Sequence, residues 1–227
     1  MQTIDLYYYS ITQHGLADCA DRYLAVMDDA EKQRYKRFLR DKPRYTFGLA
    51  RYLLKTELAK RLGRSALSLS FDYSENGKPF LKDEPQLCFN LSHCDSAVVF
   101  AVADVDVGVD VEPHHRRGDH WQNSSEFINK NVAAYIDDLK ADSEKILAFA
   151  RYWTAMEAYT KLKAARFYEV KEGFCDRGER IVDNAFQAYR DCEIYSLAAP
   201  FEDQISLAVS NRAGRELAVR IFQSPIE

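Results

Sequence analysis

The sequence predicts an α+β fold made of helices and a sheet of short strands. Apolar residues recur at helical spacing in long segments, and they alternate with polar residues in several short runs, as in half-buried strands. The stretches NLSHCDSAVVFAVAD and YSLAAPFEDQISLAVSN each join two alternating runs by a polar turn, and each follows a long helix. Two similar subdomains would explain the similarity between these two stretches, although any pair of hairpins shows the same pattern.

The N-terminal part predicts a strand followed by two helices. The opening MQTIDLYYYS indicates a first strand, and EKQRYKRFLRDKPRY, which follows Asp28 and Asp29, indicates a helix that Pro43 kinks or ends. Leucines at helical spacing predict a second helix from about Tyr45 to Leu62, and Gly63 is its expected C-cap.

The middle of the chain predicts a sheet of adjacent strands. Turn signals such as Asn76-Gly77 and Asp95-Ser96 separate four apolar-alternating runs. These runs are Leu67 to Tyr73, Leu87 to His93, Ala97 to Ala103 and Val105 to Glu112.

Residues 114 to 124 lack an apolar period and predict a loop. Helices are expected near Glu126 to Leu139 and from about Ser143 to Ala165. The chain then closes with strands near CEIYSLAA, QISLAVS and ELAVRIF.

Composition excludes several classes of protein. The net charge of -4 provides no basic excess for coating a nucleic acid, and the apolar runs fall far short of the ~20 residues that span a bilayer. The N-terminus does not resemble a signal peptide, so a cytoplasmic location is expected. The five scattered cysteines lack CxxC spacing, which argues against a disulfide framework and a zinc site.

Two pairs of charged residues are candidates for chemistry. In VDVGVDVEP, Asp110 and Glu112 lie two apart on a predicted strand, which places both carboxylates on one face. In WTAMEAYTK, Glu157 and Lys161 lie four apart on a predicted helix, again on one face. Taken alone, each pair is better explained as a solvated face: an acidic strand edge for the first and a surface ion pair for the second.

Three further features are candidates for contact with phosphate. Ser92 and His93 end a predicted strand, and Lys78 follows a turn that Pro79 restrains. The first helix carries a basic cluster of Lys32, Arg34, Lys36, Arg37 and Arg40. Each feature alone is also consistent with ordinary solvation.

Taken together and in order, the motifs NGKP, FNLSH, GVDVE and W-T-x-x-E-A-x-x-K resemble the 4'-phosphopantetheinyl transferases of the larger, two-subdomain type. The resemblance covers about residues 31 to 165. It implies two subdomains related by pseudo-two-fold symmetry, residues 1–105 and 106–227, with coenzyme A in the cleft and a metal site at their interface. It also implies a monomer that transfers the phosphopantetheine group of coenzyme A to a serine of an apo acyl or peptidyl carrier protein.

The resemblance also implies roles for individual residues. Asp110, Glu112 and Glu157 match the acids that hold Mg²⁺, and Glu157 also matches an acid that helps to activate the serine hydroxyl. Lys161 matches the lysine that meets the pyrophosphate. The remaining coenzyme A contacts are expected from Arg34, Lys78, Pro79, Ser92 and His93.

Two positions depart from the family pattern. Met156 stands where the family commonly has a lysine, and Val132 stands where a glutamate is common. These departures predict the loss of a cation near the phosphates and of a candidate general base. They also motivate an alternative function, a non-catalytic coenzyme A or carrier-protein binding module. A third reading is a Mg²⁺-dependent hydrolase of nucleotide pyrophosphates.

Overall fold

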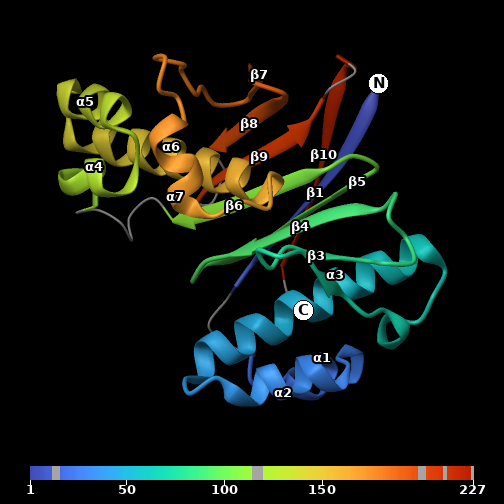
Figure 1. Cartoon of the computed structure of the whole chain (residues 1–227). Helices are drawn as coiled ribbons and strands as arrows, with labels where there is room; N and C mark the ends of the chain where they lie inside the picture. Colours follow the sequence, from blue (N-terminus) through green and yellow to red (C-terminus); the bar gives the residue numbers. More distant parts are fainter. Residues whose placement is uncertain (12–15, 114–119, 199–202, 212–213, 226–227) are drawn as a thin grey trace.

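Two four-stranded sheets form the framework of the chain (Figure 1). The structure, a computed structural model, describes residues 1–11, 16–113, 120–198, 203–211 and 214–225. The first sheet has the order β10-β1-β5-β4 and consists of β1 (Gln2–Ser10), β4 (Cys88–His93), β5 (Ala97–Ala103) and β10 (Leu217–Pro225). The second has the order β6-β9-β8-β7 and consists of β6 (Val107–Pro113), β7 (Ala185–Tyr189), β8 (Cys192–Ala198) and β9 (Asp203–Ser210).

The end of the chain returns to the first sheet. β10 pairs with β1 in parallel, with Gln2 opposite Leu217, whereas the other pairs in both sheets are antiparallel. A short hairpin of β2 (Asp72–Tyr73) and β3 (Pro79–Phe80) lies outside the two sheets. The division into residues 1–105 and 106–227 and the pseudo-two-fold symmetry stay predictions.

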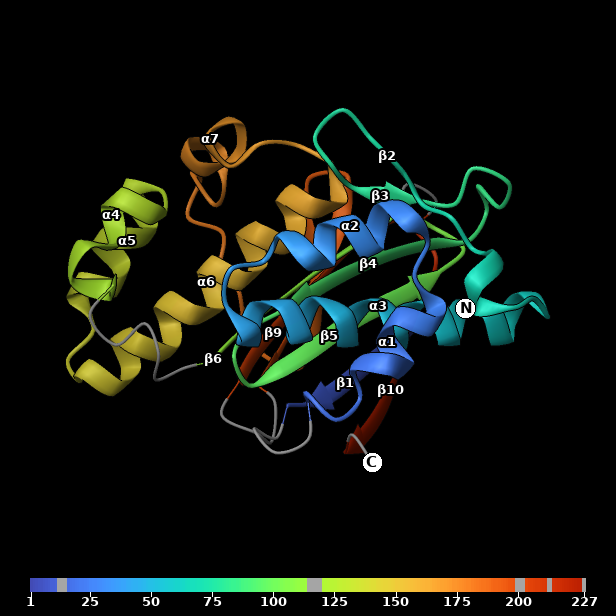
Figure 2. The same ribbon diagram turned by 90° about the horizontal axis from the view of Figure 1, so that it is seen from below.

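Three helices cover the first sheet: α1 (Ala20–Val26), α2 (Asp29–Arg37) and α3 (Asp41–Leu62). α3 runs along the sheet, and α1 and α2 lie over α3 (Figure 2). Asp28 and Glu31 form a capping box that starts α2, and Gly63 ends α3 in the left-handed region, at φ 62°. Pro43 falls in the first turn of α3, where a backbone N–H has no intrahelical acceptor, so it is compatible with the helix start.

The helices of the second half are α4 (Ser124–Phe127), α5 (Lys130–Asp138), α6 (Asp142–Leu162) and α7 (Phe167–Val170). α6 lies over β6 and β9, and α4 and α5 lie beside its N-terminal end (Figure 1). Short 3-10 turns occur at Ala66–Ser68, His120–Asn123 and Lys171–Gly173.

Alternation along β6 assigns its two faces to different partners. Val107, Val109 and Val111 are buried in a core that also holds residues of β1, β5 and β9. The residues between them therefore point the other way, toward α6. Asp110 and Glu112 thus face the helix that carries Glu157 and Lys161.

The predicted α+β fold class is confirmed, and the strand predicted for Ala97 to Ala103 matches β5. The strand predicted for Leu67 to Tyr73 is wrong over most of its length. A 3-10 turn occupies its start, where Ser68 Oγ donates to Ser65 O, and only Asp72 and Tyr73 pair. Local side-chain hydrogen bonding competes with strand pairing there.

The helix predicted for Glu126 to Leu139 is interrupted. Asn129 caps α5 by accepting from Asn131 N at 2.7 Å, so a new helix begins there. Of the predicted loop at 114 to 124, residues 114–119 lie outside the described part of the chain. All five cysteines are free thiols, as expected. In the segments that the structure describes, no helix has the length and apolarity needed to cross a bilayer.

Candidate functional site

Three elements bring Ser92, Asp110 and Lys161 together. Lys161 on α6 donates from Nζ to Asp110 Oδ1 of β6 at 2.6 Å and to Ser92 Oγ of β4 at 2.9 Å. Ser92 Oγ donates in turn to the same carboxylate oxygen at 2.7 Å. The site therefore lies at the seam between the two sheets, where their edge strands β4 and β6 meet under α6. A backbone tie supports this seam, because Asn90 Oδ1 accepts from Val109 N at 2.9 Å.

The carboxylate of Asp110 retains binding capacity. Asp110 is 5% exposed, and its second oxygen, Oδ2, is buried without a hydrogen-bond partner among the described residues. An unpartnered buried oxygen costs free energy, roughly 1–3 kcal/mol or more for a charged group. This oxygen is therefore suited to binding a cation.

A glycine allows α6 to approach β6 this closely. A Cβ built at Gly108 would lie 2.0 Å from Ala158 O and 2.4 Å from Leu162 N, which are backbone atoms of α6. Real Cβ atoms do not approach backbone so closely, so a side chain at position 108 would push the helix away. Gly108 thus sets the distance between Asp110 and Lys161.

Glu112 and Glu157 are each half-buried on β6 and α6. The predicted set of three acids is not assembled as a metal cage: within the described residues, no group of three His, Cys, Asp or Glu side chains lies close enough to hold a metal ion. The assignment of Asp110, Glu112 and Glu157 to a metal therefore stays a prediction. The unpartnered oxygen of Asp110 is the feature of the structure that fits a cation.

The turn that carries Lys78 binds the end of α6. Lys78 Nζ donates to Leu162 O at 3.3 Å and to Val107 O at 3.0 Å, and Asn76 Nδ2 donates to Ala164 O at 2.9 Å. Burial lowers the pKa of the Lys78 ammonium. The amine that the sequence assigned to coenzyme A is thus already bonded to two carbonyls, and its role toward a ligand stays a prediction.

A pocket of about 180 Å³ opens between this turn and α6. Its lining includes Lys161, Lys78 and Pro79, together with Asn90 and Leu91 of β4. The predicted adenine-side turn and the predicted pyrophosphate lysine therefore border one cavity.

Positive charge gathers around His93, which is exposed at the end of β4. Partial removal of the imidazole from water lowers the pKa of His93 below its ordinary value. The positive charge of Lys161 lowers it further, and Arg34 and Arg51 act in the same direction, while Asp110 opposes them. His93 is therefore a neutral imidazole at pH 7 in a field that favours anions.

Sequence reasoning missed a buried charge cluster beneath this region. Lys55 Nζ lies 2.7 Å from Glu31 Oε2, and Arg51 Nε lies 3.4 Å from Glu31 Oε1. Two cations share one acid, and all three side chains are at most 5% exposed. The cluster carries an excess positive charge, which adds to the potential at His93. Its only signal in the sequence is a pair of basic residues, Arg51 and Lys55, four apart within the apolar middle stretch of α3.

The two positions that depart from the family pattern lie in the core. Met156 is fully buried and Val132 is 5% exposed, and both belong to the core cluster around Tyr152 and Ile136. Both side chains therefore pack the core of the second half. The predicted loss of a cation and of a general base stays a prediction.

Comparisons with known proteins find the family that the sequence motifs resemble. Residues 106–209 match the 4'-phosphopantetheinyl transferase superfamily. The chain is 33% identical over 141 residues to the 4'-phosphopantetheinyl transferase HetI of Nostoc sp., a match that covers 60% of this chain and 59% of that protein. It is 29% identical over 92 residues to a 4'-phosphopantetheinyl transferase of Bacillus subtilis, covering 40% and 41%. It is 28% identical over 131 residues to the enzyme gsp of Aneurinibacillus migulanus, covering 58% and 53%. The chain thus spans less than two thirds of the length of these curated relatives.

Proposed function

Because the chain belongs to the 4'-phosphopantetheinyl transferase superfamily, we propose that it transfers the 4'-phosphopantetheine group of coenzyme A to a serine of an apo carrier protein. The observation that carries this proposal is the contact of Lys161 with Asp110 and Ser92 beside the pocket. The matched stretch 106–209 contains both Asp110 and Lys161. The carrier is an acyl or peptidyl carrier protein or domain.

The reaction needs positive charge at the pyrophosphate. The serine oxygen forms a bond to the β-phosphorus of coenzyme A, and the bond from that phosphorus to the bridging oxygen breaks, which releases 3',5'-ADP. Negative charge then grows on the phosphate oxygens and on the leaving group. An ammonium held in advance by Asp110 and Ser92 stabilises that charge without reorganising, and Lys161 is assigned this role.

Mg²⁺ is the cation that the residues suit. Asp110, Glu112 and Glu157 are the acids that would hold it, with Asp110 as the direct ligand that the structure favours. Mg²⁺ prefers oxygen ligands and commonly takes only one or two carboxylates beside substrate phosphates, so a complete cage of three acids is not required. When bound, it neutralises charge on the pyrophosphate oxygens. The unpartnered Oδ2 of Asp110 supports this assignment.

The remaining contacts with coenzyme A are assigned from the residues that line the pocket and from the positive charge near His93. Lys78 and Pro79 border the adenine side, where the Lys78 stem and the Pro79 ring offer flat apolar surface. We assign the contacts with the phosphates to Ser92, His93 and Arg34. The imidazole of His93 is neutral in the free protein, and it can take up a proton when an anion lies beside it. The serine proton needs an acceptor of its own, and Glu157 is the carboxylate that we assign to it.

The binding-module alternative rests on Met156 and Val132, which pack the core, and not on any contact at the pocket. No contact in the described part of the chain favours the hydrolase reading. The two-subdomain type, the monomeric state and the cytoplasmic location stay predictions.

Mass spectrometry of carrier proteins tests the proposal. The chain is mixed with coenzyme A, Mg²⁺ and a panel of apo acyl and peptidyl carriers, and each carrier is weighed intact. We expect at least one carrier to gain the mass of one phosphopantetheine, with 3',5'-ADP released in equal amount. Coenzyme A consumed at the same rate without any carrier would instead establish a hydrolase, and binding without any turnover would establish a binding module.

A further inference from the structure

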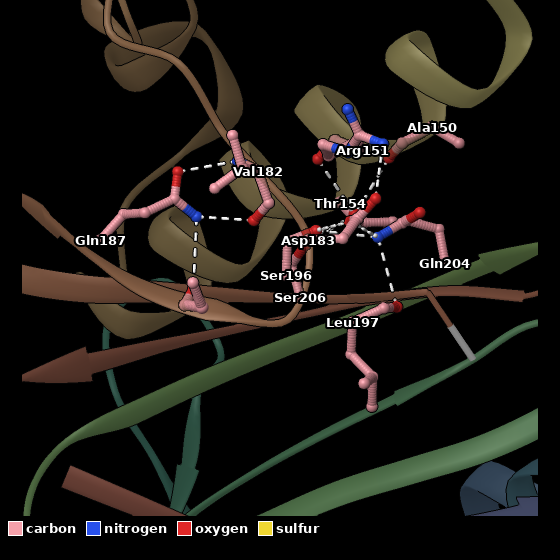
Figure 3. A network of polar contacts seen from close by, with 11 residues as sticks. Ala150, Arg151, Thr154, Val182, Asp183, Gln187, Ser196, Leu197, Gln204 and Ser206 are labelled. Carbon is pink, nitrogen blue, oxygen red and sulfur yellow. Dashed lines mark hydrogen bonds and ion pairs between the residues drawn. The ribbon is translucent and has the colours of Figure 1, made fainter. Parts of the chain in front are cut away.

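A layer of polar side chains is buried between α6 and the second sheet (Figure 3). Thr154, Ser196 and Ser206 have no exposed surface, and Gln204 is 1% exposed. Burying such groups is costly unless they are hydrogen-bonded, and here each one is. Apolar residues in place of buried ionic and polar groups are often neutral for stability or stabilising, so we looked for a role of this layer beyond stability.

Asp183 is the centre of the layer. Gln204 Nε2 donates to Asp183 Oδ1 at 3.1 Å and to Ser196 Oγ at 2.8 Å, and Ser196 Oγ donates to the same Asp183 oxygen at 2.9 Å. Arg151 of α6 forms an ion pair with Asp183 Oδ2. The loop before β7, the helix and two strands are therefore joined through one carboxylate.

Strand register connects this layer to the two acids of the proposed site. Ser206 lies directly opposite Asp110, and Gln204 lies directly opposite Glu112. Residues that are directly opposite in an antiparallel pair share a face of the sheet and have neighbouring side chains. The layer and the acids thus form one continuous polar surface under α6.

One face of α6 makes the contacts with this layer and with Asp110 along the length of the helix. Arg151 meets Asp183, and Thr154 Oγ1 shares a hydrogen bond of 2.8 Å with Ser206 Oγ. Further along, Lys161 meets Asp110. The three helix positions are spaced by three and seven residues, as expected for one face of a helix. The network therefore holds α6 at the position in which Lys161 reaches Asp110.

We propose that Gln204, Asp183 and Thr154 are positioning residues that hold Glu112 and Asp110 of β6, and α6 above them, in the arrangement that receives the cation and the pyrophosphate. The inference rests on the proposed function, because it takes Asp110 and Glu112 to be ligands of that cation. Residues that orient metal ligands typically change metal affinity or activity by about 10- to 100-fold when they are removed.

The substitution Gln204→Met tests the proposal, with Gln187→Met as its matched control. Gln187 also holds this loop: its Oε1 accepts from Val182 N at 2.8 Å, and its Nε2 donates to Val182 O at 2.7 Å. It is on β7, apart from Gln204 (Figure 3), whereas the strand that pairs with the acids is β9. Two quantities are measured: the Mg²⁺ concentration for half-maximal transfer, and the dissociation constant of Mn²⁺ in the presence of coenzyme A alone, by electron paramagnetic resonance. The second readout needs no turnover.

Gln204→Met is expected to raise both quantities by about 10- to 100-fold, whereas Gln187→Met leaves them within twofold of the wild type. Equal and unchanged values in the two variants would overturn the proposal and leave the layer a purely structural device. Should Gln204→Met fail to fold, Thr154→Val and Thr154→Ser replace it. The valine removes the hydroxyl and is expected to weaken Mn²⁺ binding, while the serine keeps it and restores binding; an unchanged valine variant would contradict the proposal.

The two proposals fail separately. A wild type that binds Mn²⁺ with coenzyme A but modifies no carrier would contradict the proposed function, and the Mn²⁺ comparison would still decide the role of the network. A wild type that binds no Mn²⁺ would contradict the role of the network and the metal assignment together.

Discussion

At the scale of single residues, substitution of Lys161 distinguishes a catalytic role from a surface ion pair. The two roles predict very different effects on the rate of transfer. Lys161 contacts Asp110 and Ser92, and it lines the pocket. Lys161→Met is therefore expected to lower kcat by ~10² or more, because a preorganised donor to the transition state is lost. The control is Lys163→Met, which removes a lysine two positions along the helix that pairs with Asp191 on the surface. Steady-state kinetics that fall equally in both variants would contradict the assignment of Lys161.

His93 gives a second prediction at this scale, through its lowered pKa. In the free protein the imidazole is neutral at pH 7. A bound phosphate favours the charged form and raises the pKa of His93, so binding takes up a proton and the affinity rises as the pH falls from 8 to 6. Calorimetry of 3',5'-ADP binding in buffers of different ionisation enthalpy measures that uptake.

His93→Gln serves as the control for this titration, because phosphate itself also titrates in the same range. The variant should lose most of the proton uptake seen in the wild type. An uptake that is unchanged in His93→Gln would show that the imidazole does not meet the phosphate.

Residue-scale interpretation of the sequence succeeded where a side chain's direction follows from local periodicity. Alternation on β6 predicted that Asp110 and Glu112 share a face, and helical spacing predicted the same of Glu157 and Lys161. The contact between the two elements, from Lys161 to Asp110, came from the structure. Contacts between distant segments were out of reach, since no local pattern links Asp183 to Gln204 or Glu31 to Lys55. For the same reason, Met156 and Val132 were assigned to the pocket although they are in the core.

At the scale of elements, the packing of α6 on β6 depends on Gly108. Gly108→Ala is expected to destabilise the protein by about 1–3 kcal/mol, the usual cost of overpacking, and to reduce transfer by separating Lys161 from Asp110. Gly173→Ala is the control, because its new Cβ would meet only the flexible Arg190 side chain, at 3.1 Å. Urea unfolding and transfer rates are measured for both. A Gly108→Ala variant as stable and active as Gly173→Ala would contradict the close approach of α6.

The turn at Lys78 gives another prediction for elements. Lys78→Met keeps the stem but removes the ammonium from Val107 O and Leu162 O. Leaving buried carbonyls without a donor costs about 1–3 kcal/mol, so the free energy of unfolding should fall by that amount. Amide hydrogen exchange should also rise at the end of α6. Lys82 is an exposed lysine nearby, and the control substitution Lys82→Met should change neither the free energy of unfolding nor the amide exchange. A Lys78→Met variant with the same protection as Lys82→Met would contradict the proposed bonding of Lys78 to the end of α6.

Element boundaries were predictable where hydrophobic pattern alone decides them. β5 is buried along its whole length and matched its prediction. The run Leu67 to Tyr73 has the composition of a strand, but most of it has no neighbouring strand to pair with. Pairing is a property of tertiary structure, so the sequence of one segment does not reveal it.

At the scale of the whole molecule, the site depends on contacts between the two sheets. Ser92 and Asn90 come from the first sheet and Asp110 and Val109 from the second, and α6 adds Lys161. The return of β10 to pair with β1 joins the end of the chain to the first sheet. The parallel pairing of the two chain ends was not predictable, because nothing in either strand's own pattern specifies its distant partner.

The central claim is that this seam transfers phosphopantetheine through Asp110. The most direct measurement is intact-mass analysis of an apo carrier mixed with coenzyme A, Mg²⁺ and either the wild type or Asp110→Asn, with 3',5'-ADP binding measured in parallel. We predict that the wild type adds one phosphopantetheine to the carrier, whereas Asp110→Asn still binds 3',5'-ADP and transfers at least ~10² more slowly. An Asp110→Asn variant that transfers near the wild-type rate would contradict the claim.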